Sequence, residues 1–516
     1  MREVKSLDSR QQTADSRCNR LICEIIIFVA SLCFLLLFSS STRPGSPDPI
    51  AGDQAMFMTI GKYWAKGVLP YVGLWDSKGP IIFFINALGY LIFGSKTGIF
   101  IIQLICLTVS LVLAFKILRL KLSSKLSMIF TMLTLLFLSL VHAVDSVEEY
   151  TLPLLMLSFY CILKWLILLE QTKKVKFFPK YGFVLGLTFS FCLLTRVTDA
   201  VGICAVVLVI AIYLVYNRLW LNLVQNAIAA LAGIALLLFP FIIYFSLYGA
   251  LFDFFYGTIL YNLSYAANAS FNSNLSLEII IGYSPSCLLL FVGIFNIFKK
   301  RYIKSALYLL VGLLTLLVLI KSYHYLHYGM IAIPYIPIVI CEVYENIRKD
   351  GRIPFVNVKK RTICICFVAV LAIVSFGLAA KETFLGYQYE HFLRYPHGDQ
   401  IDPIDVELEL CEKNIPKEEK NSFVAYNCKD GIYLYLDICP YYRFFTMQDW
   451  AAQNDTTLTD LIKETYYEGD CKWILTQTYG DQDIGIQEVL DSKYDLMEES
   501  DVPSTEISIK LYRISE

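Results

Sequence analysis

Charged residues are scarce in this chain. Asp, Glu, Lys and Arg make up only 17% of its 516 residues, whereas 56% are hydrophobic. A soluble domain has about a quarter of its residues charged, so the composition excludes an ordinary soluble protein. The apolar excess lies in repeated runs of about 18 to 24 residues, each long enough to cross a bilayer as a helix. The sequence therefore predicts a mainly α-helical, polytopic membrane protein.

Further absences narrow the range of functions. No Gly-rich phosphate-binding loop occurs in the sequence. The four cysteines outside the apolar runs have no metal-type spacing, so no cofactor is required; a divalent metal is an alternative that no ligand pattern supports. A net charge of −1 gives no indication of nucleic-acid binding.

Apolar length and the distribution of Lys and Arg together predict about eleven transmembrane helices. The candidate spans are 21–41, 97–118, 126–143, 151–170, 181–196, 199–216, 225–248, 278–298, 303–320, 326–346 and 361–381. The apolar segment 81–94 is only about 14 residues long, which is short for a span. We expect it to form a helix at the membrane interface instead.

The loop charges give an orientation for these spans. If the N-terminus (1–20) is cytoplasmic and 81–94 does not span, the loops 119–125, 173–180, 216–222, 299–304 and 347–361 all carry basic residues on the cytoplasmic side. The loops 144–150 and 249–277, on the other side, contain no Lys or Arg. The first external loop is then 42–96, within a transmembrane domain of 21–381. The polar tail, 382–516, is also external.

The tail has the pattern of a small α/β domain. Short strands are expected at 421–427, 442–447, 471–477 and 509–514, with helices at 455–467 and 484–494. Four cysteines lie in it, namely Cys411, Cys428, Cys439 and Cys471. They could form two disulfides if the tail faces an oxidising compartment; whether they do stays open.

Ionisable residues from four separate short loops are predicted to meet at the external membrane surface. They are Asp53, Asp76 and Lys78; Asp145, Glu148 and Glu149; Arg196, near Asp199; and Lys321, His324 and His327. Charges at membrane depth usually line a cavity or a path. This mixture suits an anionic ligand attacked by a neutral nucleophile, because a carboxylate can accept a proton and cations can hold a phosphate.

Each of these residues also has a purely structural interpretation. Asp53 could cap a helix, and Lys78 could extend toward lipid headgroups. Glu148 and Glu149 could cap the fourth span, Arg196 could neutralise Asp199, and His324 and His327 could be interfacial residues without a ligand. The functional interpretation therefore rests on their convergence at one surface, which depends on the topology.

Three segments carry a resemblance to a known family. They are "PYVGLWDSKGP" (70–80), which contains Tyr71, "DSVEEYTLP" (145–153) and "YHYLHYGMIAIPYIP" (323–337). Together with the long first external loop, they resemble the GT-C superfamily of membrane glycosyltransferases. The sequence is most similar to the bacterial relatives of protein O-mannosyltransferases and of the lipid A aminoarabinose transferase, over about residues 15–345.

The resemblance implies a GT-C fold in a bacterial inner membrane. It also implies transfer of a sugar from a polyprenyl-phosphate-type lipid to an unknown acceptor on the non-cytoplasmic face, with inversion. Asp53 matches the family's first-loop carboxylate, Lys78 its phosphate-contacting lysine, and Glu149, beside Glu148, its second acid. Arg196 falls where a basic residue faces the donor phosphate. Tyr71, Asp76 and Asp145 lie within the matching motifs.

Two other classes remain as alternatives. A transporter or flippase for lipid-linked sugars would place charges near the middle of spans and often shows inverted repeats, and no repeat is apparent here. A polysaccharide polymerase or ligase would carry its large charged loop late in the chain rather than after the first span.

Overall fold

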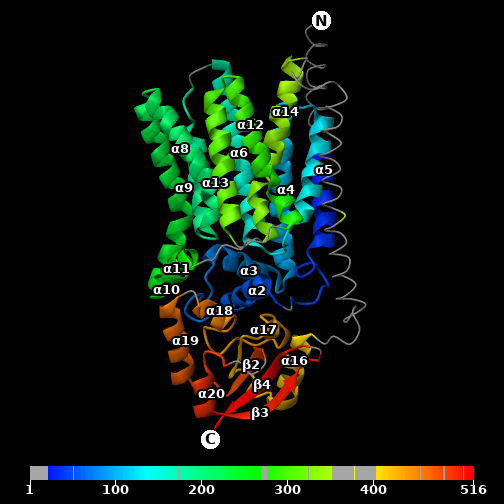
Figure 1. The fold of residues 1–516 in the computed structure, drawn as a ribbon, viewed down its shortest axis with the longest axis vertical. Helices are drawn as coiled ribbons and strands as arrows, with labels where there is room; N and C mark the ends of the chain where they lie inside the picture. Colours follow the sequence, from blue (N-terminus) through cyan, green and yellow to red (C-terminus); the bar gives the residue numbers. More distant parts are fainter. Residues whose placement is uncertain are drawn as a thin grey trace.

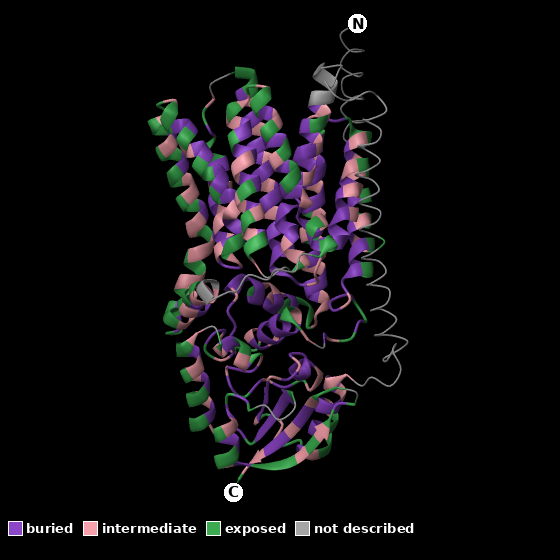
Figure 2. Cartoon of the chain, in the orientation of Figure 1, coloured by how far each residue is buried: buried purple, intermediate pink, exposed green. Residues whose placement is uncertain are grey.

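The computed structural model describes residues 21–49, 51–172, 175–268, 276–322, 325–350, 377, 402–453, 455–479, 483–503 and 505–515. They form a helical bundle with a small C-terminal domain at one end, and two short helices, α2 and α3, lie between them (Figure 1). Buried positions fill the interior of the bundle, and exposed positions follow its outer surface (Figure 2).

Eight helices in the described part of the chain are long and apolar enough to cross a membrane, and a bent pair raises the number to nine. The eight are Leu21–Phe38, α4 (Thr97–Arg119), α5 (Ser124–Val141), α6 (Val147–Thr172), η1 with α8 (Val197–Tyr216), α9 (Trp220–Leu247), α12 (Leu277–Phe298) and α13 (Tyr302–Lys321). The bent pair is η3 (Leu326–Ala332) with α14 (Tyr335–Asp350). Each overlaps a predicted span, and the protein is a multi-pass membrane protein.

Two predicted spans, 181–196 and 361–381, are not among these nine. The predicted span 361–381 lies outside the described residues apart from residue 377. The segment 181–196 becomes α7 (Pro179–Leu193), a helix of 15 residues. Gly186 of α7 approaches α9 so closely that an added Cβ would lie 2.0 Å from the carbonyl oxygen of Ala230. Small residues allow such close helix packing in membranes, so α7 is part of the bundle despite its length.

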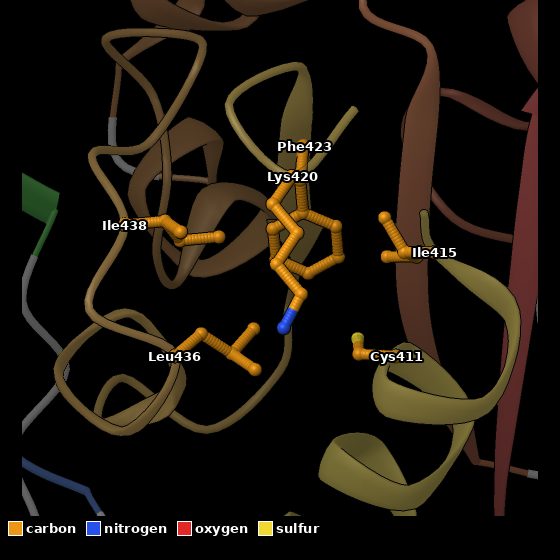
Figure 3. Close-up of a pocket in the computed structure, with 6 residues that line it drawn as sticks. All are labelled: Cys411, Ile415, Lys420, Phe423, Leu436 and Ile438. Carbon is orange, nitrogen blue, oxygen red and sulfur yellow. The ribbon is translucent and has the colours of Figure 1, made fainter. Parts of the chain in front are cut away.

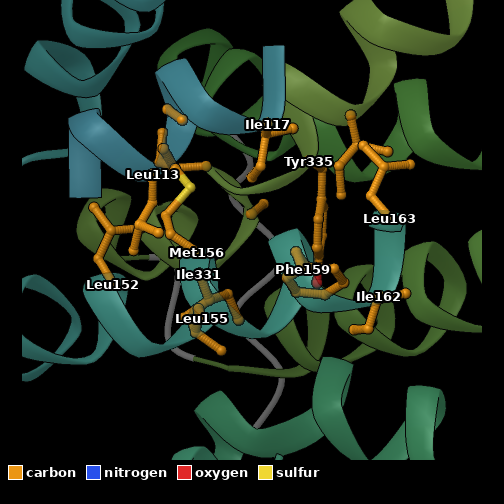
Figure 4. Close-up of a cluster of buried hydrophobic side chains, with 14 of the residues drawn as sticks. Leu113, Ile117, Leu152, Leu155, Met156, Phe159, Ile162, Leu163, Ile331 and Tyr335 are labelled. Atoms are coloured by element: carbon orange, nitrogen blue, oxygen red, sulfur yellow. The ribbon is translucent and has the colours of Figure 1, made fainter. Parts of the chain in front are cut away.

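The bundle has a continuous apolar core. Figure 4 shows its centre, where side chains of α4, α6, η3 and α14 interdigitate. Leu113 and Ile117 of α4 belong to the same buried cluster as Met156 and Phe159 of α6, and the Phe159 ring packs edge-on against Tyr335 at 5.3 Å between centroids. Filling the interior with large side chains leaves each helix in a defined position, which fixes the loops at its ends.

The segment 81–94 forms the expected short helix, α3 (Pro80–Phe93), of 14 residues. Pro80 occupies its first position, where a missing N–H costs no hydrogen bond. Gly94 ends it with φ +67°, a left-handed value that favours glycine. α3 packs on α2 (Asp53–Trp64) through Gly61, whose added Cβ would lie 2.3 Å from the Cβ of Asn86. The two helices therefore form one rigid unit of the first loop.

The C-terminal domain is built on one sheet with the strand order β1-β2-β4-β3. The strands are β1 (Phe423–Tyr426), β2 (Trp473–Tyr479), β3 (Tyr494–Asp501) and β4 (Ile507–Ile514). β1 and β2 are parallel, and the other pairs are antiparallel. The helices are α16 (Pro403–Asn414), α17 (Ile432–Tyr435), α18 (Gln448–Ala452), α19 (Thr456–Glu468) and α20 (Gln487–Lys493). Three of the four predicted strands and both predicted helices are confirmed.

The strand predicted at 442–447 is wrong. These residues form a loop whose backbone carbonyls are bound by side chains instead of a neighbouring strand. The hydroxyl of Tyr466 donates to the Phe444 carbonyl at 2.8 Å, and that of Tyr433 donates to the Phe445 carbonyl at 3.0 Å. Both Phe rings are buried, which explains the apolar pattern. β3 was not predicted, because its acidic side chains have low strand propensity and suit an exposed edge.

The four cysteines of the tail are free thiols in this structure. Cys411, Cys428 and Cys471 are buried, and Cys439 is half-buried. The thiol of Cys471 donates to the Trp473 carbonyl at 3.3 Å, and that of Cys428 donates to the Leu475 carbonyl at 3.5 Å. Each thus acts as a small core residue with a weak donor.

Candidate functional site

Asp53 and Lys78, from two ends of the first loop, lie together. The ammonium of Lys78 is 3.8 Å from the Oδ2 of Asp53. Asp53 is the first residue of α2, and Lys78 lies two residues before Pro80, the start of α3. The Asp53 side chain is 52% exposed and the Lys78 side chain 28%. The pair is therefore close enough to attract but accessible to a third group.

The loop segment that carries Lys78 is hydrogen-bonded to the segment that precedes Arg196. The N–H of Gly79 donates to the Thr195 carbonyl at 3.0 Å, and that of Ile81 donates to the Leu194 carbonyl at 3.1 Å. A Cβ added to Gly79 would lie 2.1 Å from the Leu194 carbonyl oxygen. Only glycine allows this approach, which places Lys78 beside Arg196.

Arg196 is held by three side chains, of which Glu148 and Tyr328 come from other parts of the bundle and Asp199 from its own segment. Its Nη1 donates to the Oε1 of Glu148, on α6, at 2.5 Å. The Oδ1 of Asp199, one turn along the chain, is 3.8 Å away. The guanidinium lies 3.3 Å from the centre of the Tyr328 ring, a cation–π contact. Arg196 therefore presents a fixed positive charge on the Lys78 side of the bundle.

His327 belongs to the same group of charges. It precedes Tyr328 on η3, and its ring is stacked 5.6 Å from the Tyr325 ring, with an interplanar angle of 16°. Glu148, Arg196, Asp53 and Lys78 all act on it electrostatically. The site thus draws on the first loop, α6, the segment after α7, and η3.

Glu149 faces a different set of partners from its neighbour Glu148. Its Oε2 accepts a hydrogen bond from the Nε2 of Gln103 at 2.8 Å, and its Oε1 lies 3.3 Å from the Nε2 of His142. The hydroxyl of Thr42 donates to the other side of Gln103 at 2.6 Å. Adjacent helical residues point about 100° apart, so the two glutamates serve two separate polar networks.

Asp145 lies at the edge of the Glu149 network and is fully buried. Its Oδ1 accepts from the Tyr150 hydroxyl at 2.6 Å and from the Asn86 amide at 3.2 Å. Its Oδ2 has no hydrogen-bond partner among the described residues. Burial raises the pKa of the Asp145 carboxyl to about 8, and the nearby Glu149 adds to the shift against these two hydrogen bonds. A protonated Asp145 at neutral pH is a structural hydrogen-bonding group.

Asp76 and Tyr71 lie behind Lys78. The Tyr71 hydroxyl donates to the carbonyl of Lys78 at 2.7 Å and accepts from the Thr258 hydroxyl at 3.2 Å. Asp76 is 6% exposed, and burial raises its pKa, although Lys78 opposes the shift. Tyr71 therefore fixes the backbone of Lys78, and Asp76 supplies a second negative charge near its ammonium.

Both cations stay charged in this setting. Burial acts to lower the pKa of Lys78 and of Arg196. Asp53 and Asp76 outweigh this for Lys78, and Tyr328, Asp199 and Glu148 do so for Arg196, so both pKa values are raised. Two permanent positive charges next to a partly exposed carboxylate match the needs of an anionic ligand.

The structure says less about two other residues that the sequence proposed for the site. Lys321 is the last residue of α13, and His324 lies outside the described residues. No group of three or more His, Cys, Asp or Glu side chains in the described ranges is arranged to hold a metal ion.

Sequence reasoning missed two members of the site as functional residues and one of its supports. Asp199 was considered only as a structural partner of Arg196, and Tyr328 was part of a motif without a role. Asp430 of the C-terminal domain accepts a hydrogen bond from the N–H of Gly52, the residue before Asp53, at 2.9 Å; no local pattern indicated it.

The charged residues of this site are called the loop cluster. They are Asp53, Asp76, Lys78, Glu148, Arg196 and Asp199.

A small pocket in the C-terminal domain is separate from the loop cluster. Cys411, Ile415, Lys420, Phe423, Leu436 and Ile438 line it (Figure 3). Apart from Lys420 its walls are apolar, and it holds no acid–cation pair of the kind found at Asp53 and Lys78.

The membrane bundle, the long first loop with its acid–lysine pair, and the C-terminal α/β domain together resemble the architecture of the GT-C superfamily. Residues 77–245 match the family model described as dolichyl-phosphate-mannose-protein mannosyltransferase. A search of curated proteins finds no significant match.

Solved structures of ArnT show the same fold. ArnT from Cupriavidus metallidurans in the apo state superimposes with a TM-score of 0.55 at 12% identity, covering 95% of this chain and 97% of that chain. The same protein bound to undecaprenyl phosphate gives 0.52 at 13% identity, with 95% and 98% covered. The Archaeoglobus fulgidus oligosaccharyltransferase complex with Zn and sulfate gives 0.48 at 12% identity, with 88% and 68% covered. The expected resemblance to GT-C glycosyltransferases is confirmed.

Proposed function

We propose that this protein is a glycosyltransferase that moves a sugar from a polyprenyl-phosphate-type lipid to an acceptor. The observation that carries the proposal is the partly exposed Asp53 placed 3.8 Å from Lys78, with Arg196 fixed beside them. The match of residues 77–245 to a mannosyltransferase family supports it. So does the shared fold with an ArnT structure that holds undecaprenyl phosphate.

The reaction we propose is a single displacement at the anomeric carbon, with inversion. The acceptor oxygen or nitrogen forms the new bond to this carbon while its proton passes to the carboxylate of Asp53. The bond between the anomeric carbon and the phosphate oxygen breaks, and its electron pair leaves with the polyprenyl phosphate. Lys78 and Arg196 stabilise the negative charge that this phosphate gains. No metal is needed for this balance.

Glu148 and Glu149 have different roles in this proposal. Glu148 holds Arg196 in place through the 2.5 Å contact, so it acts on the donor side. Glu149 is bound to Gln103 and His142, and supports the segment that carries Asp145. Among the carboxylates of the site, Asp53 is thus best placed to accept the proton, because its side chain is exposed and the others are buried.

The placement of the protein in the membrane is also part of the proposal. A cytoplasmic N-terminus puts the basic loops inside and the loop cluster outside, in a bacterial inner membrane. Residues 21–381 would then be the catalytic membrane domain and 382–516 an external domain. A reporter enzyme fused after residue 382 should be active only outside the cytoplasm, and cytoplasmic activity would overturn this orientation.

A transporter is less well supported by the structure. A transport path needs polar residues along the middle of the bundle. The described centre of the bundle is instead packed with large apolar side chains from α4, α6, η3 and α14 (Figure 4).

The test is a transfer assay with purified protein, polyprenyl-phosphate-linked sugars and membrane extract as acceptor. Asp53→Asn should lower turnover by about 10²–10⁴-fold, because the base is lost. Lys78→Ala should lower it by about 10²–10³-fold, because one charge on the leaving phosphate is lost. Lys413→Ala removes an exposed lysine that pairs with Glu498 at 2.5 Å in the C-terminal domain and should leave turnover unchanged. Wild-type turnover in both site variants would refute the assignment.

A further inference from the structure

The C-terminal domain contacts the first loop at the residue next to Asp53. The Oδ2 of Asp430 accepts a hydrogen bond from the N–H of Gly52 at 2.9 Å. Its Oδ1 accepts a hydrogen bond from the hydroxyl of Thr446. Asp430 is only 6% exposed, so this carboxylate is buried between the domain and the loop with both oxygens occupied.

Gly52 determines how the chain enters α2. Its φ is +89° and its ψ is 178°, a conformation that favours glycine. Asp53 follows immediately, and no side chain caps this end of α2. The Asp430 carboxylate binds the N–H of the N-cap residue, as the third-position acid of a capping box does, and it places a negative charge near the helix start, where such a charge is favourable. The direction of the Asp53 side chain depends on this turn.

A second contact fixes the other half of the acid–lysine pair. The N–H of Trp75 donates to the Arg443 carbonyl of the C-terminal domain at 2.9 Å. The Trp75 ring, which is 8% exposed, lies 5.8 Å from the Phe444 ring. Trp75 comes three residues before Lys78. One surface of the domain thus holds both loop segments.

Asp53 and Lys78 are not fixed by each other. The 3.8 Å between them is longer than a charge-assisted hydrogen bond, about 2.7–2.9 Å. Their separation is therefore set by the backbones on which they stand, and those backbones are anchored to the C-terminal domain.

We propose that Asp430 is a positioning residue that holds Asp53 in place for the transfer reaction. This inference rests on the proposed function. It gives the C-terminal domain a defined role, because the domain completes the active site through the Asp430–Gly52 hydrogen bond. The chemistry itself remains with Asp53, Lys78 and Arg196.

The structure offers a matched control at the opposite end of the same helix. Asp437, also in the C-terminal domain, pairs with Lys62 of α2 at 2.8 Å and lies 4.0 Å from Lys66. Its side chain is 72% exposed. Asp437→Ala therefore removes a contact between the domain and α2 without touching the turn at Gly52.

The test compares Asp430→Ala, Asp430→Asn and Asp437→Ala in the full-length protein. Asp430→Ala should lower kcat by about 10–100-fold, as expected for a displaced reacting group, with KM for the lipid donor unchanged. Asp430→Asn keeps an oxygen for Gly52 and should stay within about threefold of wild type, well short of the loss that misplacement causes. Asp437→Ala should match wild type.

Hydrogen exchange provides a readout that does not depend on activity. Amides of residues 51–57 should lose protection in Asp430→Ala only, with exchange in the sheet of the C-terminal domain unchanged. Equal kcat in Asp430→Ala and Asp437→Ala, or unchanged exchange at 51–57, would overturn the inference. A wild-type protein without transferase activity would refute the proposed function instead, and the exchange result would still decide whether Asp430 anchors the loop.

Discussion

Two clusters of charged residues lie at opposite ends of the bundle, and they differ in the balance between their positive and negative charges. The far cluster consists of Lys121, Glu170, Arg301, Lys304, Glu342 and Glu345, and it lies at the end away from the C-terminal domain. It has three cations and three carboxylates, with contacts of 2.6 Å for Lys304–Glu170, 3.0 Å for Lys304–Glu342 and 2.7 Å for Lys121–Glu345. Its charges are balanced in number and its two lysines are closely paired, whereas Arg301 lies 3.6–4.0 Å from its carboxylates.

The loop cluster has two cations for four carboxylates, and its pairing is incomplete. Lys78 is 3.8 Å from its nearest carboxylate. Neither carboxylate oxygen of Asp199 has a hydrogen-bond partner among the described residues, although Asp199 is 2% exposed. Charges that are buried without full pairing are costly and are concentrated at functional sites. The far cluster joins helices, and the excess of carboxylates in the loop cluster is consistent with the ligand-binding role proposed for it.

The largest expected effect is on the stability provided by the far cluster. Glu342→Gln removes one partner of Lys304, and both side chains are almost fully buried. Breaking a buried ion pair from one side costs about 3–5 kcal/mol. Denaturant unfolding in detergent, followed by tryptophan fluorescence, should show this loss, with turnover per folded molecule unchanged.

The control for this variant is Glu498→Gln, which breaks the exposed pair with Lys413 in the C-terminal domain. An exposed pair contributes about 0–1 kcal/mol, so its stability should be near that of wild type. If Glu342→Gln instead lowered turnover and left stability intact, the distinction between the two clusters would be wrong.

A smaller effect is expected when Arg196 is replaced by Lys. The charge is kept, but the planar group that contacts both Glu148 and the Tyr328 ring is lost. We expect turnover to fall roughly 100-fold, the cost of one misplaced donor at a developing charge. Steady-state kinetics on the lipid donor measure this.

Arg513→Lys is the matched control for that substitution. Arg513 also lies over an aromatic ring, 5.6 Å from the centre of Trp473, and 3.7 Å from Glu419. Both of these partners belong to the C-terminal domain and not to the loop cluster, so turnover should be unchanged. Equal losses in both variants would mean that Arg196 acts through general stability.

The smallest expected effect, taken per pH unit, is a change in the pH dependence of stability at Asp145. An unfolded chain releases this proton at about pH 4, whereas the folded carboxyl has a pKa of about 8. The folded state therefore holds an extra proton between these values, and stability falls as the pH rises through that window. The slope for one proton is about 1.4 kcal/mol per pH unit.

Asp145→Asn should flatten this slope, because the amide keeps an acceptor for Tyr150 and cannot ionise. Unfolding measured at several pH values between 5 and 7 tests it, with the exposed Asp491→Asn as control. An unchanged slope in Asp145→Asn would show that Asp145 is ionised in the folded protein.

The sequence allowed much of the fold to be predicted, because helix length and charge bias act locally. The apolar segment 81–94 was expected to form a short helix, and the structure has it as α3, which begins at Pro80 and is followed by Gly94. The position of the 15-residue helix α7 in the chain was also predicted from its local apolar sequence. The loop at 442–447 could not be predicted, because its backbone partners, Tyr433 and Tyr466, come from other elements.

The candidate site was predictable only as a set of residue types. The sequence placed acids and cations at one end of the bundle but could not separate Glu148, which binds Arg196, from Glu149, which binds Gln103. That distinction depends on the rotation of α6 within the bundle. The contact that the C-terminal domain makes with the first loop could not be predicted either, since Asp430 and Gly52 are 378 residues apart in the sequence.

The backbone contact at Gly79 has a consequence for which donors fit. Lys78 and Arg196 stand on two segments joined by main-chain hydrogen bonds of 3.0 and 3.1 Å, so the backbones that carry the two cations are held next to each other. Under the proposed function, this fixed backbone separation limits the size of the phosphate group that both cations can contact. We expect discrimination between monophosphate and diphosphate lipids to depend on this backbone contact.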